Sequence, residues 1–150
     1  MTVENTSELA WVFQHSVDCN APRHFAWSYW TNIANWNDPP ATFDLDGPFE
    51  LGSRLTTSLP GQTLRSVIRK VVNGSRSDEA IIDMQLPGAI LSFQWRFESL
   101  SEDRTGITQR LTLSGANADA LVAQASILEK TTPEGMQKLV AAIERSMKAK

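Results

Sequence analysis

His15 and Gln109 are polar side chains that the sequence pattern places among apolar neighbours, where a titratable or hydrogen-bonding group has chemical use. His15 shares a strand face with Phe13 and Val17, and burial there favours a neutral imidazole that serves as a base or a hydrogen-bond partner. A buried amide without a partner costs ~1–3 kcal/mol, so Gln109 must find one. Two interpretations stay open for each residue. His15 is a catalytic base or a core histidine satisfied by a carbonyl or a water, and Gln109 orients a ligand oxygen or bonds to a neighbouring side chain.

Other kinds of chemistry have no anchor in this sequence. His15, His24 and Cys19 are the soft metal ligands present, and they lack the spacing of a tetrahedral site. The chain has neither a glycine-rich phosphate loop nor a Gly-x-Ser-x-Gly nucleophile turn. Alternation places Asp83 and Glu98 on the solvent side of their strands. We therefore predict no metal site and no cofactor.

Length and composition are typical of a single soluble globular domain. The chain has 150 residues, of which 41% are hydrophobic and 21% charged. A net charge of −3 argues against nucleic acid as a partner. The polar, acidic start is not that of a signal peptide, no apolar run reaches the length of a membrane span, and there is one cysteine. We expect a cytoplasmic protein, a monomer or weak homodimer, with residues 1–7 flexible.

The N-terminal third predicts one strand and a pair of short helices. Residues 9–19 alternate as a strand that faces inward with Trp11, Phe13, His15, Val17 and Cys19. Asn20 is expected to cap a helix that Pro22 opens, since proline is tolerated in the first turn. After a break near residues 32–35, the sequence Asp38-Pro39-Pro40 ends anything helical.

Six strand-length segments follow between residues 41 and 115, separated by turn signals such as Asn73-Gly74 and Pro87-Gly88. The clearest strand alternates Phe93, Trp95 and Phe97 with polar residues. In the segment 62–72 the alternation breaks, which predicts a β-bulge. Together the segments indicate an antiparallel meander.

The C-terminal segment predicts one long amphipathic helix. Its apolar stripe steps by three or four residues from Leu121 to Met147, which corresponds to about 45 Å of helix. The stripe keeps its phase through Pro133, so we expect a kink there or two coaxial pieces. Thr132 interrupts the stripe beside Pro133. This weak point is either a gate through which a ligand enters or a static bend that follows the sheet.

The order of strand, helix pair, six-stranded meander and long helix resembles the helix-grip fold of the START-like superfamily, which includes Bet v 1-like proteins and bacterial polyketide cyclase/dehydrase-like proteins. The local sequences that carry the resemblance to the bacterial branch are Ala21-Pro22, Ala26-Trp27, Asn35-Trp36, Asp38-Pro39, Pro87-Gly88, Phe93-Gln94-Trp95, the segment 106–110 and Ser114-Gly115. The resemblance implies an α+β fold, in which a curved seven-stranded antiparallel sheet wraps around the C-terminal helix and leaves an internal cavity.

Such a cavity is implied to bind an apolar or aromatic small molecule, and three functions follow as alternatives. The first is ligand binding, the second is a cyclase- or dehydratase-type enzyme that uses His15 as its base, and the third is a protein-interaction module like the chaperone activators of the superfamily. Besides His15, the predicted ligand-binding residues are Phe13, Trp36, Phe43, Leu55, Ile82, Met84, Phe93, Trp95, Phe97, Gln109, Leu128, Thr132 and Met136.

Overall fold

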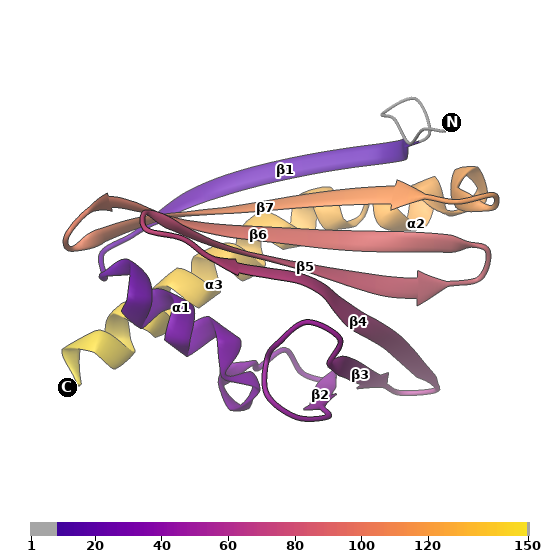
Figure 1. Ribbon diagram of the computed structural model, residues 1–150. Coiled ribbons are helices and arrows are strands. Elements are labelled where there is room, and N and C mark those ends of the chain that lie inside the picture. Colours follow the sequence, from indigo (N-terminus) through magenta and orange to yellow (C-terminus); the bar gives the residue numbers. More distant parts are fainter. Residues whose placement is uncertain (1–8, 150) are drawn as a thin grey trace.

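The computed structural model describes residues 9–149 as one curved antiparallel sheet with helices on one face (Figure 1). The expected flexibility of residues 1–7 lies outside the described residues. The elements, in chain order, are β1 (Leu9–Cys19), α1 (Arg23–Thr31), the 3₁₀ turn η2 (Ile33–Asn35), β2 (Thr42–Leu45), β3 (Arg54–Leu59), β4 (Gln62–Asn73), β5 (Ser77–Leu86), β6 (Ala89–Ser101), β7 (Arg104–Ser114), the 3₁₀ turn η3 (Ala118–Leu121), α2 (Val122–Ala125) and α3 (Leu128–Lys148).

The seven strands form the meander that the turn signals predict. Their order across the sheet is β1-β7-β6-β5-β4-β3-β2, with every neighbouring pair antiparallel. The predicted bulge is confirmed, because the register of β4 against β5 shifts between Ile68 and Lys70. We call the face that α3 covers the inner face and the opposite one the outer face. Alternation then assigns every strand residue to one face.

The segment between β1 and β2 differs from the predicted helix pair. Helix α1 begins at Arg23, and Pro22 takes the N-cap position without a side-chain hydrogen bond, so the expected Asn20 cap is wrong. The backbone N–H of Asn20 instead donates to Glu144 Oε2 at 2.8 Å. The expected second helix is only the 3₁₀ turn η2, whose Asn32 side chain accepts a hydrogen bond from the backbone N–H of Ala34.

The C-terminal helix is interrupted earlier than the sequence suggested. Helix α3 continues through Pro133, and the break lies at Ser126 and Ile127, between α2 and α3. There the Ser126 hydroxyl donates to the Ala123 carbonyl at 2.9 Å, a local bond that competes with helical continuation. The uninterrupted helix has 21 residues, or about 32 Å. It is shorter than the expected 45 Å.

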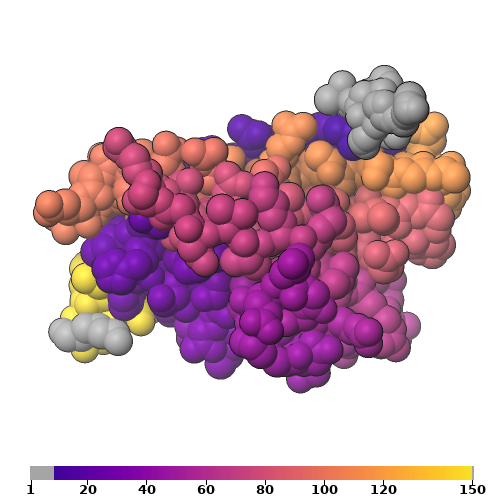
Figure 2. All heavy atoms as spheres, in the orientation of Figure 1, coloured from indigo at the N-terminus to yellow at the C-terminus, as the bar shows by residue number. Residues whose placement is uncertain are grey.

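Two contacts fix α3 across the inner face. Trp11 Nε1 donates to Glu129 Oε2 at 2.8 Å near the start of α3, and Asn20 meets Glu144 near its end. The helix therefore runs in the same direction as β1, across the sheet (Figure 1). Figure 2 shows α1 and the β2–β3 segment along one rim of the sheet.

The buried apolar residues form two clusters at opposite ends of the inner face. The α1-side cluster contains Trp30, Phe97 and Met136, and the α2-side cluster contains Trp11, Leu111 and Ala125. The middle of the inner face lies between them.

Candidate functional site

Strand register brings the two predicted polar residues together on the inner face. His15 of β1 lies directly opposite Gln109 of β7, and Gln109 lies opposite Trp95 of β6. Directly opposed residues in an antiparallel pair have Cβ atoms roughly 4.5–5.5 Å apart. His15, Gln109 and Trp95 therefore form one row across three adjacent strands.

Thr132 faces the sheet from helix α3, near this row. It follows Glu129, which is bonded to Trp11, by one helical turn, and it faces inward because it is buried. Helix α3 then continues along β1 toward Glu144 and Asn20. Interpolating between these two fixed contacts places Thr132 near the level of Phe13, two residues before His15 on the same face of β1.

These three polar side chains lack partners. Within residues 9–149, no hydrogen bond or ion pair reaches the side chain of His15, Gln109 or Thr132. In that same range, Ser66 Oγ is the side-chain polar atom that is both fully enclosed and unpaired. The polar atoms of the other three must therefore still touch open space. Polar side chains inside a protein that have no protein partner form their hydrogen bonds with a ligand or with water.

Aromatic side chains flank this row. Phe93 and Trp95 stand on the inner face of β6 but are only half-buried, whereas their β7 neighbours Gln109 and Leu111 are buried. Phe93 packs against both apolar clusters and so lies between them. The middle of the inner face is thus less completely covered than its two ends.

The remaining aromatic rings gather at the α1 end. The ring of Trp30 lies 4.9 Å from Trp95 and 5.4 Å from Phe97, measured between ring centroids. Trp36 donates from Nε1 to the Trp30 carbonyl at 2.6 Å and meets Phe43 edge-on at 5.3 Å. This cluster closes that end of the inner face with aromatic surface.

The other predicted ligand-binding residues divide by depth. Leu55, Ile82, Phe97 and Met136 are buried in the α1-side cluster. Phe13, Met84 and Leu128 are half-buried against the α2-side cluster, and Phe13 stacks on Trp11. Whether any of them contacts a ligand remains a prediction.

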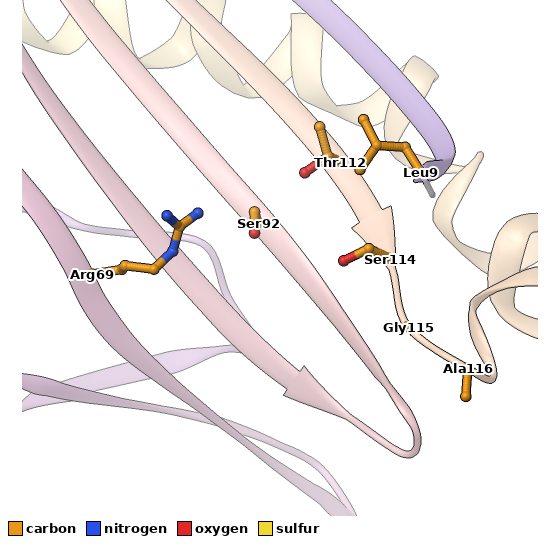
Figure 3. Close-up of a pocket in the computed structure, with 7 residues that line it drawn as sticks. All are labelled: Leu9, Arg69, Ser92, Thr112, Ser114, Gly115 and Ala116. Carbon is orange, nitrogen blue, oxygen red and sulfur yellow. The ribbon is translucent and has the colours of Figure 1, made fainter. Parts of the chain in front are cut away.

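Two surface depressions in the described part of the chain lie outside the space between the inner face and α3. One, of about 430 Å³, is bounded by residues 31–34 around η2 and by residues 43–49, including the predicted Phe43. The other, of about 650 Å³, lies on the outer face over β6 and β7 (Figure 3). The predicted internal cavity therefore remains a prediction.

Sequence reasoning missed two buried carboxylates. Asp78, 4% exposed, binds Arg23 Nη1 at 2.6 Å and Asn73 Nδ2 at 2.9 Å, which ties α1 to the sheet. Asp83 was predicted on the solvent side. It does lie on the outer face, but it is buried under Arg69. Alternation gives the face of a residue, whereas long neighbouring side chains decide its burial.

The environment of Cys19 makes its thiol unreactive. It is fully buried, and burial together with the charge of Glu144 raises the pKa of the thiol from 9.0 to about 11. Between residues 9 and 149, no three His, Cys, Asp or Glu side chains gather as a metal site. Among the helices that the structure describes, none has the length and apolar character needed to cross a bilayer.

Comparison with known proteins identifies the fold. No protein-family model matches the chain, and no curated protein matches it by sequence. Among solved structures, the hypothetical protein jhp0584 from Helicobacter pylori has a TM-score of 0.75 at 14% identity, with 95% of this chain and 98% of that chain covered.

Two similar structures are enzymes. Norcoclaurine synthase from Thalictrum flavum, in complex with dopamine and hydroxybenzaldehyde, has a TM-score of 0.70 at 12% identity, over 100% of this chain and 96% of that chain. The ZhuI aromatase/cyclase from Streptomyces sp. R1128 has a TM-score of 0.68 at 15% identity, over 91% and 95%. The chain has the helix-grip α+β fold of these proteins, as the resemblance implied.

Proposed function

We propose that this protein binds an apolar or aromatic small molecule between the inner face of the sheet and helix α3. The observation that carries the proposal is the set of three polar side chains, His15, Gln109 and Thr132, which we call the polar row. Their polar atoms are unpaired within the described residues and still open to space. Beside the row stand the half-buried rings of Phe93 and Trp95. A flat ligand stacks on such rings while its oxygens meet the polar row.

The similar structures support the same class of ligand. The norcoclaurine synthase structure holds dopamine and hydroxybenzaldehyde, which are aromatic rings with polar substituents. Fold alone does not transfer a ligand between proteins. The proposal therefore depends on the polar row and the aromatic rings of this chain.

A dye-displacement experiment tests this proposal. ANS fluorescence should rise when the dye is added to the folded protein, and hydroxybenzaldehyde should displace it. Gln109→Leu should raise the dissociation constant of hydroxybenzaldehyde about tenfold, because the ligand oxygen loses its hydrogen-bond partner. Gln94→Leu, in the neighbouring row of the sheet and on the outer face, is the matched control. Equal effects of the two substitutions, or no dye binding by the folded protein, would contradict an inner-face site.

A second candidate function is catalysis of a cyclase or dehydratase type, with His15 as the base. It is favoured by the register that sets His15 opposite Gln109, so that one group accepts a proton while the other holds an oxygen of the same substrate. Product formation from dopamine and hydroxybenzaldehyde is the direct assay. His15→Gln should abolish turnover while hydroxybenzaldehyde still displaces ANS. Turnover that survives this substitution would remove His15 from the mechanism.

A further inference from the structure

The outer face carries a depression that the inner-face proposal does not use. Its volume is about 650 Å³, and its lining comes from four strands and the turn after β7 (Figure 3). The lining residues are Leu9, Arg69, Ser92, Thr112, Ser114, Gly115 and Ala116. Ser92, Thr112 and Ser114 alternate with the buried Leu91, Leu111 and Leu113, so they belong to the face opposite α3.

A buried carboxylate organises the floor of this depression. Asp83 is 7% exposed, and each of its oxygens accepts a short hydrogen bond. Arg69 Nε lies 2.5 Å from Oδ2, and the Ser92 hydroxyl donates to Oδ1 at 2.6 Å. Because Asp83 holds the guanidinium through Nε alone, both terminal nitrogens of Arg69 remain unpaired within residues 9–149. They form the paired donor edge that binds a carboxylate in a bidentate manner.

The bulge in β4 explains how Arg69 reaches Asp83. The register of β4 against β5 passes from Ile68 opposite Ile82 to Lys70 opposite Ile81, which leaves Arg69 as the inserted residue. A regular strand would place residues 69 and 70 on opposite faces, whereas a bulge turns both outward. Arg69 then pairs with Asp83, and Lys70 lies 3.6 Å from Glu79.

Hydroxyl groups complete the lining on the other side. Ser92 lies between Arg69 and the β7 residues Thr112 and Ser114, whose oxygens are on the side toward Ser92 (Figure 3). In the described part of the chain, neither hydroxyl has a hydrogen-bond partner, so both are open to a ligand. The site therefore offers the donor edge of the Arg69 guanidinium on one side and free hydroxyls on the other.

Local charge on this face favours an anion. Arg65 and Arg110 stand on the outer face in the rows that flank the depression, and the buried carboxylate between them is Asp83. Together with Arg69, these side chains make three arginines and one carboxylate, although the whole chain has a net charge of −3. Charge of this sign raises the local concentration of small anions.

We propose that this depression is a second binding site, which takes a small hydroxylated carboxylate through the free edge of Arg69 and the hydroxyls of Thr112 and Ser114. A carboxylate has the two coplanar oxygens that the guanidinium edge matches, and hydroxyls on the same molecule satisfy the opposite wall. The negative charge of Asp83 below the floor disfavours a dianion such as phosphate relative to a carboxylate.

An NMR titration of the full chain with three probes tests the site. D-glucuronate should shift the backbone amide signals of Ser92, Thr112 and Ser114 saturably, at a concentration about tenfold below that needed for methyl glucoside, which has the same ring without the carboxylate. Inorganic phosphate should bind more weakly than glucuronate. Methyl glucoside as tight as glucuronate, phosphate tighter than both, or no saturable shift at these amides would each overturn the proposal.

Two substitutions of one arginine and a matched control locate the binding. Arg69→Lys keeps the charge beside Asp83 but lacks the paired N–H edge, so it should raise the half-saturating glucuronate concentration about tenfold with the fold intact. Arg69→Gln should raise this concentration at least as much, because it removes the charge as well. Arg65→Gln removes a charge from the same strand and face outside the lining, and it should change that concentration less than about twofold. If Arg65→Gln raised the half-saturating concentration as much as Arg69→Lys does, glucuronate would be held by nonspecific charge attraction, and the proposed site would be wrong.

Discussion

Gln109 on the inner face and Asp83 on the outer face of the same sheet are both 7% exposed, yet their side chains differ in hydrogen bonding. The amide of Gln109 has no hydrogen-bond partner within residues 9–149, whereas the carboxylate of Asp83 accepts two short bonds. A carboxylate without partners costs far more than an amide, so the protein supplies them. An amide that still touches open space is tolerated without them. Within the described residues, the inner face therefore leaves the Gln109 amide unpaired, whereas the outer face pairs its buried charge internally.

The largest expected effect tests whether the ends of the inner face are packed core. Phe97→Ala should lower the free energy of unfolding by about 3–5 kcal/mol, because Phe97 is fully buried between Trp27, Trp30 and Trp95. Glu98→Ala, the next residue on the outer face, should change it by less than about 0.5 kcal/mol. Urea unfolding of the two variants measures the difference. Similar losses would mean that the two faces do not differ in packing.

A buried ion pair at the α1 end gives the next largest effect. Arg23→Met should lower the free energy of unfolding by about 2–4 kcal/mol, because Asp78 would stay buried with Asn73 as its remaining side-chain partner. Arg104→Met breaks an exposed pair with Asp18 and should cost less than about 1 kcal/mol. Thermal unfolding of both variants compares them. A harmless Arg23→Met would show that Asp78 finds other compensation.

The thiol of Cys19, on the inner face, should make the free energy of unfolding depend on pH. Its pKa of about 11 in the folded protein exceeds the ordinary 9.0, so the folded state holds the proton more tightly than the unfolded state does. Stability from this group is complete below pH 9 and falls as the pH rises toward 11, by about 2–3 kcal/mol. Cys19→Ala should lack this component when unfolding is measured from pH 8 to 11. Parallel curves for the variant and the parent would contradict the shift.

The smallest effect sharpens the contrast between Gln109 and Asp83 directly. Ser92→Ala should cost about 1 kcal/mol, since one bond to a buried carboxylate is lost. Gln109→Met should leave the free energy of unfolding unchanged or raise it slightly, because no hydrogen bond within the described residues is removed. Chemical denaturation of the ligand-free proteins provides the comparison. A Gln109→Met variant that loses as much as Ser92→Ala would imply a partner for the amide.

The strands and turns were predicted well, because the period-2 alternation and the turn residues that determine them are local features of the sequence. Strand β1 has the predicted bounds, and the six further strands fall between the predicted turns, because Asn73-Gly74 and Pro87-Gly88 act through backbone preferences of a few residues. The bulge in β4 was also visible as a break in alternation. Alternation likewise placed His15 and Gln109 on the inner face, although only strand register shows that they are opposite each other.

Helix ends and burial depended on contacts between residues distant in sequence. Asn20 has the side chain of a helix cap, but its backbone is engaged by Glu144, and the helix begins later. Pro133 fits within α3, while the break falls where the Ser126 hydroxyl bonds to the preceding turn.

The sequence by itself determined which residues form strands and which face each side chain takes, because both follow from local backbone geometry. The tertiary structure decided that Asp83 is buried, that Arg69 presents a free donor edge, and that Gln109 and Thr132 stay unpaired. Those properties depend on which long side chains meet across strands and on how closely α3 approaches the sheet. Neither is encoded in any one segment of the chain.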